Sequence, residues 1–218
     1  IRLEADRMVN SFVKGEDLKS EMSVVRNEFE RGENSPSRVL SQKMTAAAFE
    51  WHNYGQTTIG NRSDIERVPV GKLRQFYRKF YRPDNVMVIV AGKFEEKEAL
   101  GYLQKYFGAL SNPDIPLDDT YTTEPAQDGE RTVVVRRVGE TQLVGNAYHI
   151  PAGSHPDYAA AKALVAILSD QPTGRLYKGL VEEELATSVY ALAYAFAEPG
   201  LFMTLAEVPG DGSLEKAR

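Results

Sequence analysis

The chain has 218 residues, of which 42% are hydrophobic and 26% charged, and 31 acidic residues against 26 Lys and Arg give a net charge of −5. This length allows one or two domains with buried cores, and the composition excludes collagen, coiled coils and disordered chains. The acidic balance disfavours a nucleic-acid-binding protein, which needs a basic face. The absence of cysteine excludes disulfides, thiol catalysis and thiolate metal sites.

The first part of the chain, up to about residue 108, has mainly helical patterns. Apolar residues recur with helical spacing from Ile1 onward. After this first helix, the spacing predicts further helices over about 17–32, 36–51, 69–81 and 95–107. The helix over 69–81 carries four aromatic residues, which we expect in the core. Between the last two helices, the continuous apolar run VMVIVAG (86–92) predicts a buried strand.

Residues 109–130 separate this part from a second one with strand-like patterns. They contain three prolines and six acids and show no periodicity, which indicates a linker. Beyond it, RTVVVRRV (131–138) and QLVGNAYHI (142–150) predict a hairpin. Two helices, over about 156–168 and 173–185, and two strands, TSVYALAYAF and LFMTLAEV, complete the pattern. We therefore expect three segments: 1–108, the linker 109–130, and 131–218.

Several common functional motifs are missing from the sequence. It contains no phosphate-binding glycine loop and no G-x-S-x-G nucleophile elbow. None of the three histidines, His52, His149 and His155, has a second histidine within one helical turn, so we expect them to make structural contacts. No apolar run approaches the roughly 20 residues of a membrane-spanning helix.

Two glutamates on the helix over 17–32 form the one arrangement that indicates a chemical role. Glu21 and Glu28 are seven residues apart, so they project within about 20° of each other and lie about 10 Å apart along the axis. They flank the apolar stripe of Leu18, Met22, Val25 and Phe29. Spacing alone leaves solvated acids as the ordinary explanation. A carboxylate-pair glycosidase is another alternative, but nothing in the sequence supplies its sugar groove.

Five segments in order along the chain resemble the pitrilysin/insulinase family of zinc metallopeptidases. They are LEADRMVNSF, DLKSEMSVVRNEFERGENSP, AAAFEWHNYGQTTIGNRSDIE, LRQFYRKFYRPDNVMVIVAGKF and AYHIPAGSHPDYAAAKALVAILSDQPTGRLYKGLVEE. The resemblance implies an α+β fold of antiparallel sheets covered by helices. It makes residues 1–108 the second half of one peptidase-like unit and residues 131–218 the first half of a second, non-catalytic unit.

The resemblance also implies roles for the two glutamates. In the family, an H-x-x-E-H helix supplies two zinc ligands and the general base, and a downstream glutamate completes the site. Glu28 is similar to that downstream metal ligand, and Glu21 to the acid that supports it. The H-x-x-E-H motif is not in these 218 residues, and both ends of the chain lie within helical patterns. We therefore expect a longer natural polypeptide.

These points lead to two functional hypotheses. The first is a fragment of a zinc metalloendopeptidase that cleaves oligopeptides or unfolded chains, with Zn²⁺ in the intact protein but neither zinc nor activity in this fragment. The second is a non-catalytic peptide-binding or scaffold subunit of the same fold. A half-unit leaves a sheet edge unpaired. We therefore also expect the two halves to pair with each other within one chain, or with a second copy to form a homodimer. The bacterial periplasm and the cytoplasm both stay open as compartments.

Overall fold

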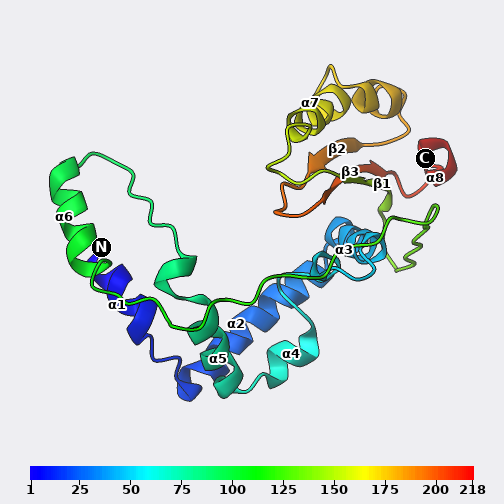
Figure 1. Cartoon of the computed structure of the whole chain (residues 1–218). Helices are drawn as coiled ribbons and strands as arrows, with labels where there is room; N and C mark the ends of the chain where they lie inside the picture. Colours follow the sequence, from blue (N-terminus) through cyan, green and yellow to red (C-terminus); the bar gives the residue numbers. More distant parts are fainter. The chain divides into compact units, whose positions relative to one another are not determined.

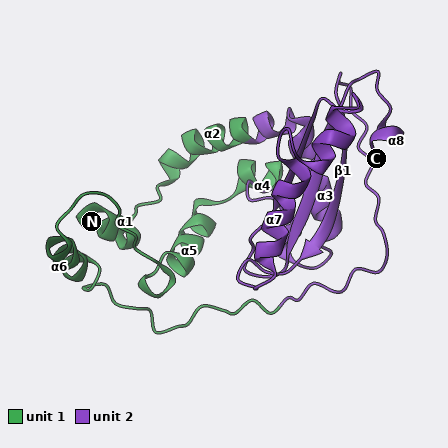
Figure 2. Cartoon of the chain, turned by 90° about the horizontal axis from the view of Figure 1, so that it is seen from above, with its two compact units in different colours: residues 1–28, 61–121 green, residues 29–60, 122–218 purple.

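The computed structural model describes residues 1–218 and divides into two compact units (Figure 2). Unit 1 comprises residues 1–28 and 61–121, and unit 2 comprises residues 29–60 and 122–218. Helix α2 (Gly15–Glu33) contributes residues to both. The domain boundaries that we predict around the linker stay a prediction. The segment 29–60 belongs with the strand-containing part of the chain.

Unit 1 consists of helices joined by extended segments. Besides its part of α2, it contains α1 (Arg2–Asn10), α4 (Arg62–Arg67), α5 (Val70–Phe80), the 3₁₀ turn η2 (Pro83–Asn85) and α6 (Glu96–Tyr106). The helices predicted over 17–32, 69–81 and 95–107 are confirmed to within two residues. None of the helices in the chain combines the length and apolar character required to cross a lipid bilayer.

The aromatic residues of α5 do not form the core that we expected. Phe76 and Tyr81 are both more than half exposed. The rings instead contact each other along the helix, with centroids 4.7 Å apart for Phe76 and Phe80 and 4.4 Å apart for Tyr77 and Tyr81. Residues four apart lie on the same helix face. The spacing therefore sets which rings meet, but not whether a second element covers them.

Residues 86–92 are not the buried strand that the sequence predicts. Their side chains are exposed, and the segment pairs with no other strand. The backbone at Val86 is nevertheless extended, with φ −132° and ψ 143°. The β-branched composition favours an extended backbone locally, whereas a strand also needs a neighbouring segment to accept and donate its hydrogen bonds. All three strands of the structure lie in unit 2, so unit 1 offers no such neighbour.

Unit 2 is built on a three-stranded antiparallel sheet with the order β1-β3-β2 (Figure 1). The strands are β1 (Gln142–Ile150), β2 (Ser188–Ala193) and β3 (Gly200–Val208). In the register of β1 and β3, Gln142 lies opposite Val208 and Ile150 opposite Gly200. The strands predicted within 142–150, 187–196 and 201–208 are confirmed, as is the α+β fold class.

Helical elements cover both faces of this sheet (Figure 1). They are α3 (Pro36–Ala48), the turn η1 (Asn53–Gly55), α7 (Tyr158–Ser169), the π-helical turn η3 (Tyr177–Val181) and α8 (Leu214–Ala217). Successive residues of β3 point to opposite faces. Leu201 and Met203 therefore pack against Phe49 and α3, while Ala206 packs against Val189 and η3. The helix predicted over 173–185 is shorter than expected, with helical residues at 175–181 that include η3.

The hairpin predicted between residues 131–138 and β1 is also wrong. Instead, arginine side chains of this segment form hydrogen bonds with residues at the ends of helices. Arg131 donates to the carbonyl of Ala47 (2.7 Å) and to the carboxylate of Glu50 (2.9 Å). Arg137 donates to the carbonyl of Glu33 (2.8 Å). Carbonyls at helix C-termini lack partners within the helix, and these guanidinium groups supply them.

Truncating the centre of β3 tests how far unit 2 depends on it. We expect Leu201→Ala to lower the free energy of unfolding by about 2–5 kcal/mol, because the side chain is fully buried and leaves a cavity. The measurement is chemical denaturation followed by circular dichroism. As a matched control, Leu164→Ala in α7, where the leucine is 41% exposed, lowers it by less than about 1 kcal/mol. Equal losses in both variants would contradict this assignment of the core.

Candidate functional site

The two glutamates predicted for a metal site lie on the exposed face of α2. Glu21 and Glu28 are both exposed. The apolar stripe beside them is half-buried and consists of Leu18, Met22, Val25 and Phe29. The helix is as predicted, whereas its stripe is less buried than we expected, and the two carboxylates lie two turns apart in contact with solvent. Their roles as zinc ligand and supporting acid stay a prediction.

The side chains of this chain do not by themselves fit a catalytic zinc ion. Such an ion takes three protein ligands and keeps one position open for water or substrate. No group of three His, Cys, Asp or Glu side chains in the structure lies close enough together to hold a metal. Glu28 is therefore one ligand residue at most, short of the three that such an ion needs.

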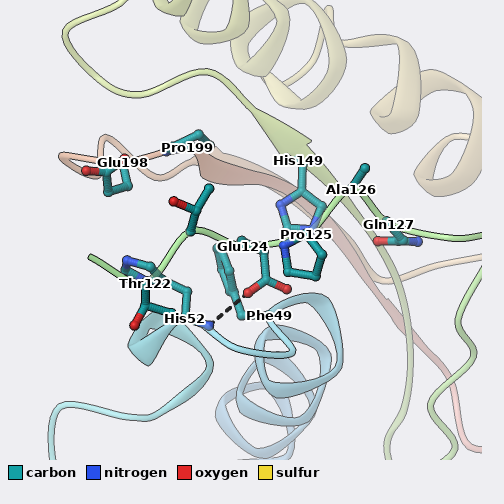
Figure 3. Close-up of a pocket in the computed structure, with 11 residues that line it drawn as sticks. Phe49, His52, Thr122, Glu124, Pro125, Ala126, Gln127, His149, Glu198 and Pro199 are labelled. Carbon is teal, nitrogen blue, oxygen red and sulfur yellow. Dashed lines mark hydrogen bonds between the residues drawn. The ribbon is translucent and has the colours of Figure 1, made fainter. Parts of the chain in front are cut away.

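A pocket of about 440 Å³ lies in unit 2, where segments distant in the sequence meet (Figure 3). Its walls come from the residues after α3, the segment 122–127, strand β1 and the turn between β2 and β3. Seven of the eleven lining residues carry polar side chains, although most of the surface that they expose to the pocket is apolar. The lining residues are Phe49, His52, Thr122, Thr123, Glu124, Pro125, Ala126, Gln127, His149, Glu198 and Pro199.

Glu124 is the central polar group of this pocket. Its carboxylate accepts three consecutive backbone N–H groups, from Glu50 (2.6 Å), Trp51 (2.9 Å) and His52 (2.8 Å). Figure 3 shows the carboxylate directed at the backbone of His52. Three N–H groups in a row form a concave anion-binding arrangement, here occupied by a side chain of the same chain. Glu124 thereby fixes the segment 122–127 to the end of α3.

The surroundings of Glu124 shift its pKa. Burial raises the pKa, but the N–H groups of Glu50, His52 and Trp51 lower it, as does the nearby His149. The net result is a pKa below the usual value for a glutamate. The carboxylate is therefore ionised at neutral pH and serves as a hydrogen-bond acceptor rather than as a general acid.

The three histidines make the structural contacts that the sequence predicts. His52 is buried, its Nδ1 accepts the N–H of Tyr54 (3.2 Å), and the two rings lie 4.1 Å apart. Nε2 of His149 lies 3.0 Å from the carbonyl of Ala48 and donates to it. His155 caps the turn before α7, where its Nδ1 accepts the N–H of Asp157 (3.2 Å).

The pocket thus lies where the segment 122–127 is hydrogen-bonded to residues 50–52, a contact that we call the joint. Glu124 and one ring nitrogen each of His52 and His149 are already engaged with the backbone. Aromatic rings also pack there. The Phe49 ring lies edge-on to the rings of Tyr54 and His149, with centroid distances of 5.6 Å and 5.2 Å. Sequence patterns do not predict these contacts, since Glu124 lies in the predicted linker, 74 residues after Glu50, and no spacing rule connects the two residues.

Replacing the Glu124 carboxylate tests this joint. We expect Glu124→Gln to lower the free energy of unfolding by about 1–2 kcal/mol at neutral pH, because an amide offers one acceptor oxygen and turns its NH₂ toward N–H donors. The native pKa is lowered, so the stabilisation exists above the unfolded pKa of about 4.3 and disappears as the pH falls through the native pKa. The difference in the free energy of unfolding between wild type and variant therefore decreases as the pH falls.

The measurement is urea denaturation at a series of pH values from neutral to acidic. Glu198→Gln serves as a control, since that side chain lines the same pocket and only its backbone N–H is bonded, to the hydroxyl of Tyr54. It should change stability little at any pH. A difference between wild type and Glu124→Gln that does not vary with pH would count against the charged acceptor.

Several relatives of the chain are bacterial proteins named as zinc proteases. It is 30% identical over 210 residues to the zinc protease PqqE of Helicobacter pylori, which covers 94% of this chain and 47% of that protein. It is 26% identical over 218 residues to a zinc protease of Streptomyces coelicolor, covering 93% of this chain and 45% of the other. The chain thus spans about half the length of the curated relatives it matches.

Solved structures agree with this relationship. A protease from Helicobacter pylori superposes with a TM-score of 0.93 and 27% identity, covering 98% of this chain and 52% of that one. A peptidase M16 inactive domain from Pseudomonas fluorescens shares the fold, with a TM-score of 0.76 and 19% identity over 94% of this chain and 50% of the other. Residues 67–217 match the family described as the peptidase M16 inactive domain. The resemblance seen in the sequence is confirmed, and the chain belongs to this family of zinc-protease-related domains.

Proposed function

We propose that the chain is a non-catalytic part of a zinc metalloendopeptidase that hydrolyses peptide bonds in oligopeptides or unfolded chains. The observation that carries the proposal is the 30% identity to the Helicobacter pylori zinc protease along 94% of this chain. The match of residues 67–217 to an inactive domain supports a structural rather than a chemical role for most of the sequence. Substrate cleavage then belongs to the longer protein.

Within that longer protein, we assign Glu28 to the metal site. Its carboxylate would supply one oxygen ligand to Zn²⁺, and the other ligands would come from polypeptide outside these 218 residues. Glu21, two turns earlier on α2, would orient the ligand or balance its charge. Two features support the assignment. The E-x6-E pattern lies in a segment that resembles the family, and the exposure of both carboxylates leaves them accessible to another part of the protein.

A second candidate function is a non-catalytic peptide-binding or scaffold subunit of the same fold. It is favoured by the inactive-domain match and by the lack of converging metal ligands in the chain. In that case Glu21 and Glu28 are ordinary solvated acids. The two candidates differ in whether Glu28 binds a metal in the longer protein.

The 218-residue chain by itself should not cleave peptides. A single carboxylate does not hold a catalytic zinc or activate a water molecule. The measurement is cleavage of a panel of fluorogenic peptides with added Zn²⁺, in the presence and absence of a chelator. The longer protein is the positive control. Chelator-sensitive cleavage by the short chain would overturn the non-catalytic assignment.

Zinc binding by the longer protein tests the role of Glu28. We expect Glu28→Gln to weaken zinc affinity more than about tenfold and Glu21→Gln to weaken it by about tenfold, the lower range for losing a supporting group. Competition with a chromogenic chelator measures both. Glu16→Gln, on the first turn of the same helix, should leave the affinity unchanged. Unchanged zinc content in all three variants would favour the scaffold alternative.

A further inference from the structure

Residues 122–130, which we call the strap, line the pocket of unit 2 with few attachments to the rest of the chain. The strap supplies six of the eleven lining residues. It contains neither helix nor strand, and no backbone–backbone hydrogen bond involves it. None of its residues belongs to the two apolar clusters that pack against the sheet. The core of unit 2 therefore does not depend on the strap.

A single side chain holds the strap to residues beside that core. Glu124 accepts the N–H groups of residues 50–52 at 2.6–2.9 Å. Hydrogen bonds to an ionised acceptor are roughly twice as strong as bonds between neutral groups. The other polar contact of the strap with the remaining chain is the ion pair of Glu130 with Arg218, in which both side chains are more than half exposed. Such surface pairs contribute little stability, so the attachment depends on Glu124.

The strap shares the pocket with a histidine whose hydrogen bonding is incomplete. His52 lines the pocket and is only 9% exposed (Figure 3). Its Nδ1 accepts the N–H of Tyr54, so in the neutral ring Nε2 carries the proton. This Nε2 is buried and has no hydrogen-bond partner within the chain. A buried donor without an acceptor destabilises the arrangement that contains it. An arrangement that gives the ring access to water removes this cost.

The chain stays attached at the end of the strap that leads to the sheet. Arg131, the next residue, donates to the carbonyl of Ala47 (2.7 Å) and to the carboxylate of Glu50 (2.9 Å). These bonds do not involve Glu124. If the Glu124 carboxylate leaves residues 50–52, Arg131 still keeps it close to them. Rebinding then closes only a short loop, which costs little conformational entropy.

We propose that the strap is a gate over the pocket of unit 2 and that Glu124 is the group that holds it closed. In the closed form, residues 122–127 form one wall of the pocket. In the open form, the bonds of Glu124 are broken, and Phe49 and His52 become accessible to water while the three-stranded sheet stays folded. Because the strap contributes nothing to the apolar clusters, this local opening requires less free energy than global unfolding.

Amide hydrogen exchange of the 218-residue chain at low urea concentrations tests the gate. Relative to unfolded-chain rates, we expect the amides of residues 50–52 to exchange at least about tenfold faster than those of β3, with little dependence on urea. Glu124→Ala should speed their exchange at least about tenfold further, and Glu124→Gln, which keeps one acceptor oxygen, should give an intermediate rate. Glu130→Ala is the matched control, because it removes only the surface ion pair, and should leave these rates unchanged.

Modification of the histidines by diethyl pyrocarbonate gives a second readout, since the reagent needs an accessible imidazole ring. In the wild type, we expect His52 to react at least about tenfold more slowly than the exposed His155. Glu124→Ala should speed the reaction of His52 about tenfold and leave that of His155 unchanged. Peptide mapping by mass spectrometry measures both rates, and circular dichroism verifies the fold of each variant.

Two sets of results would contradict the gate. If the amides of residues 50–52 show the same urea dependence as those of β3, the strap leaves its place only when unit 2 unfolds. If Glu124→Ala does not speed the modification of His52, or if Glu130→Ala speeds it equally, Glu124 is not the group that closes the pocket.

Discussion

The strand β3 (Gly200–Val208) is the element on which unit 2 depends. It is hydrogen-bonded on both edges, to β1 and to β2, and it contains the four largest fully buried side chains, Leu201, Met203, Leu205 and Val208. Leu201 and Met203 pack against α3 and Ala206 packs against η3, so one strand joins two helical layers. Burial on both faces explains its nearly continuous apolar sequence, which differs from the alternation of a strand with one solvated face.

Away from β3, charged and polar side chains connect segments through the backbone. Glu124 binds three N–H groups after α3, Arg131 and Arg137 bind carbonyls at the ends of α3 and α2, and the amide of Gln142 donates to the carbonyls of Pro209, Gly210 and Gly212. These bonds satisfy backbone groups that neither helix nor sheet can satisfy. They also explain why a region with linker-like composition is attached to unit 2.

Local patterns in the sequence predict most helices and strands correctly. They fail where the structure of a segment depends on pairing with a distant part of the chain. The helix at 70–80 and the strand at 142–150 follow from spacing alone, whereas residues 86–92 and 131–138 have strand composition without strand pairing. Pairing depends on distant segments, which one sequence does not reveal. The same limit applies to the sites. Glu21 and Glu28 gain meaning only from the family resemblance, and the bonds of Glu124 depend on contacts 72 to 74 residues away.

Unit 2 is discontinuous, since residues 61–121 separate its first stretch, 29–60, from the remainder. During synthesis, α3 and η1 leave the ribosome long before the strands that they pack against, and the central strand β3 is the last of the three to be made. Closing so long a loop costs conformational entropy before any burial compensates for it, which slows folding. The apolar face of α3 therefore stays uncovered while the intervening helices are translated. A chaperone that binds exposed apolar surface has most to protect during this period.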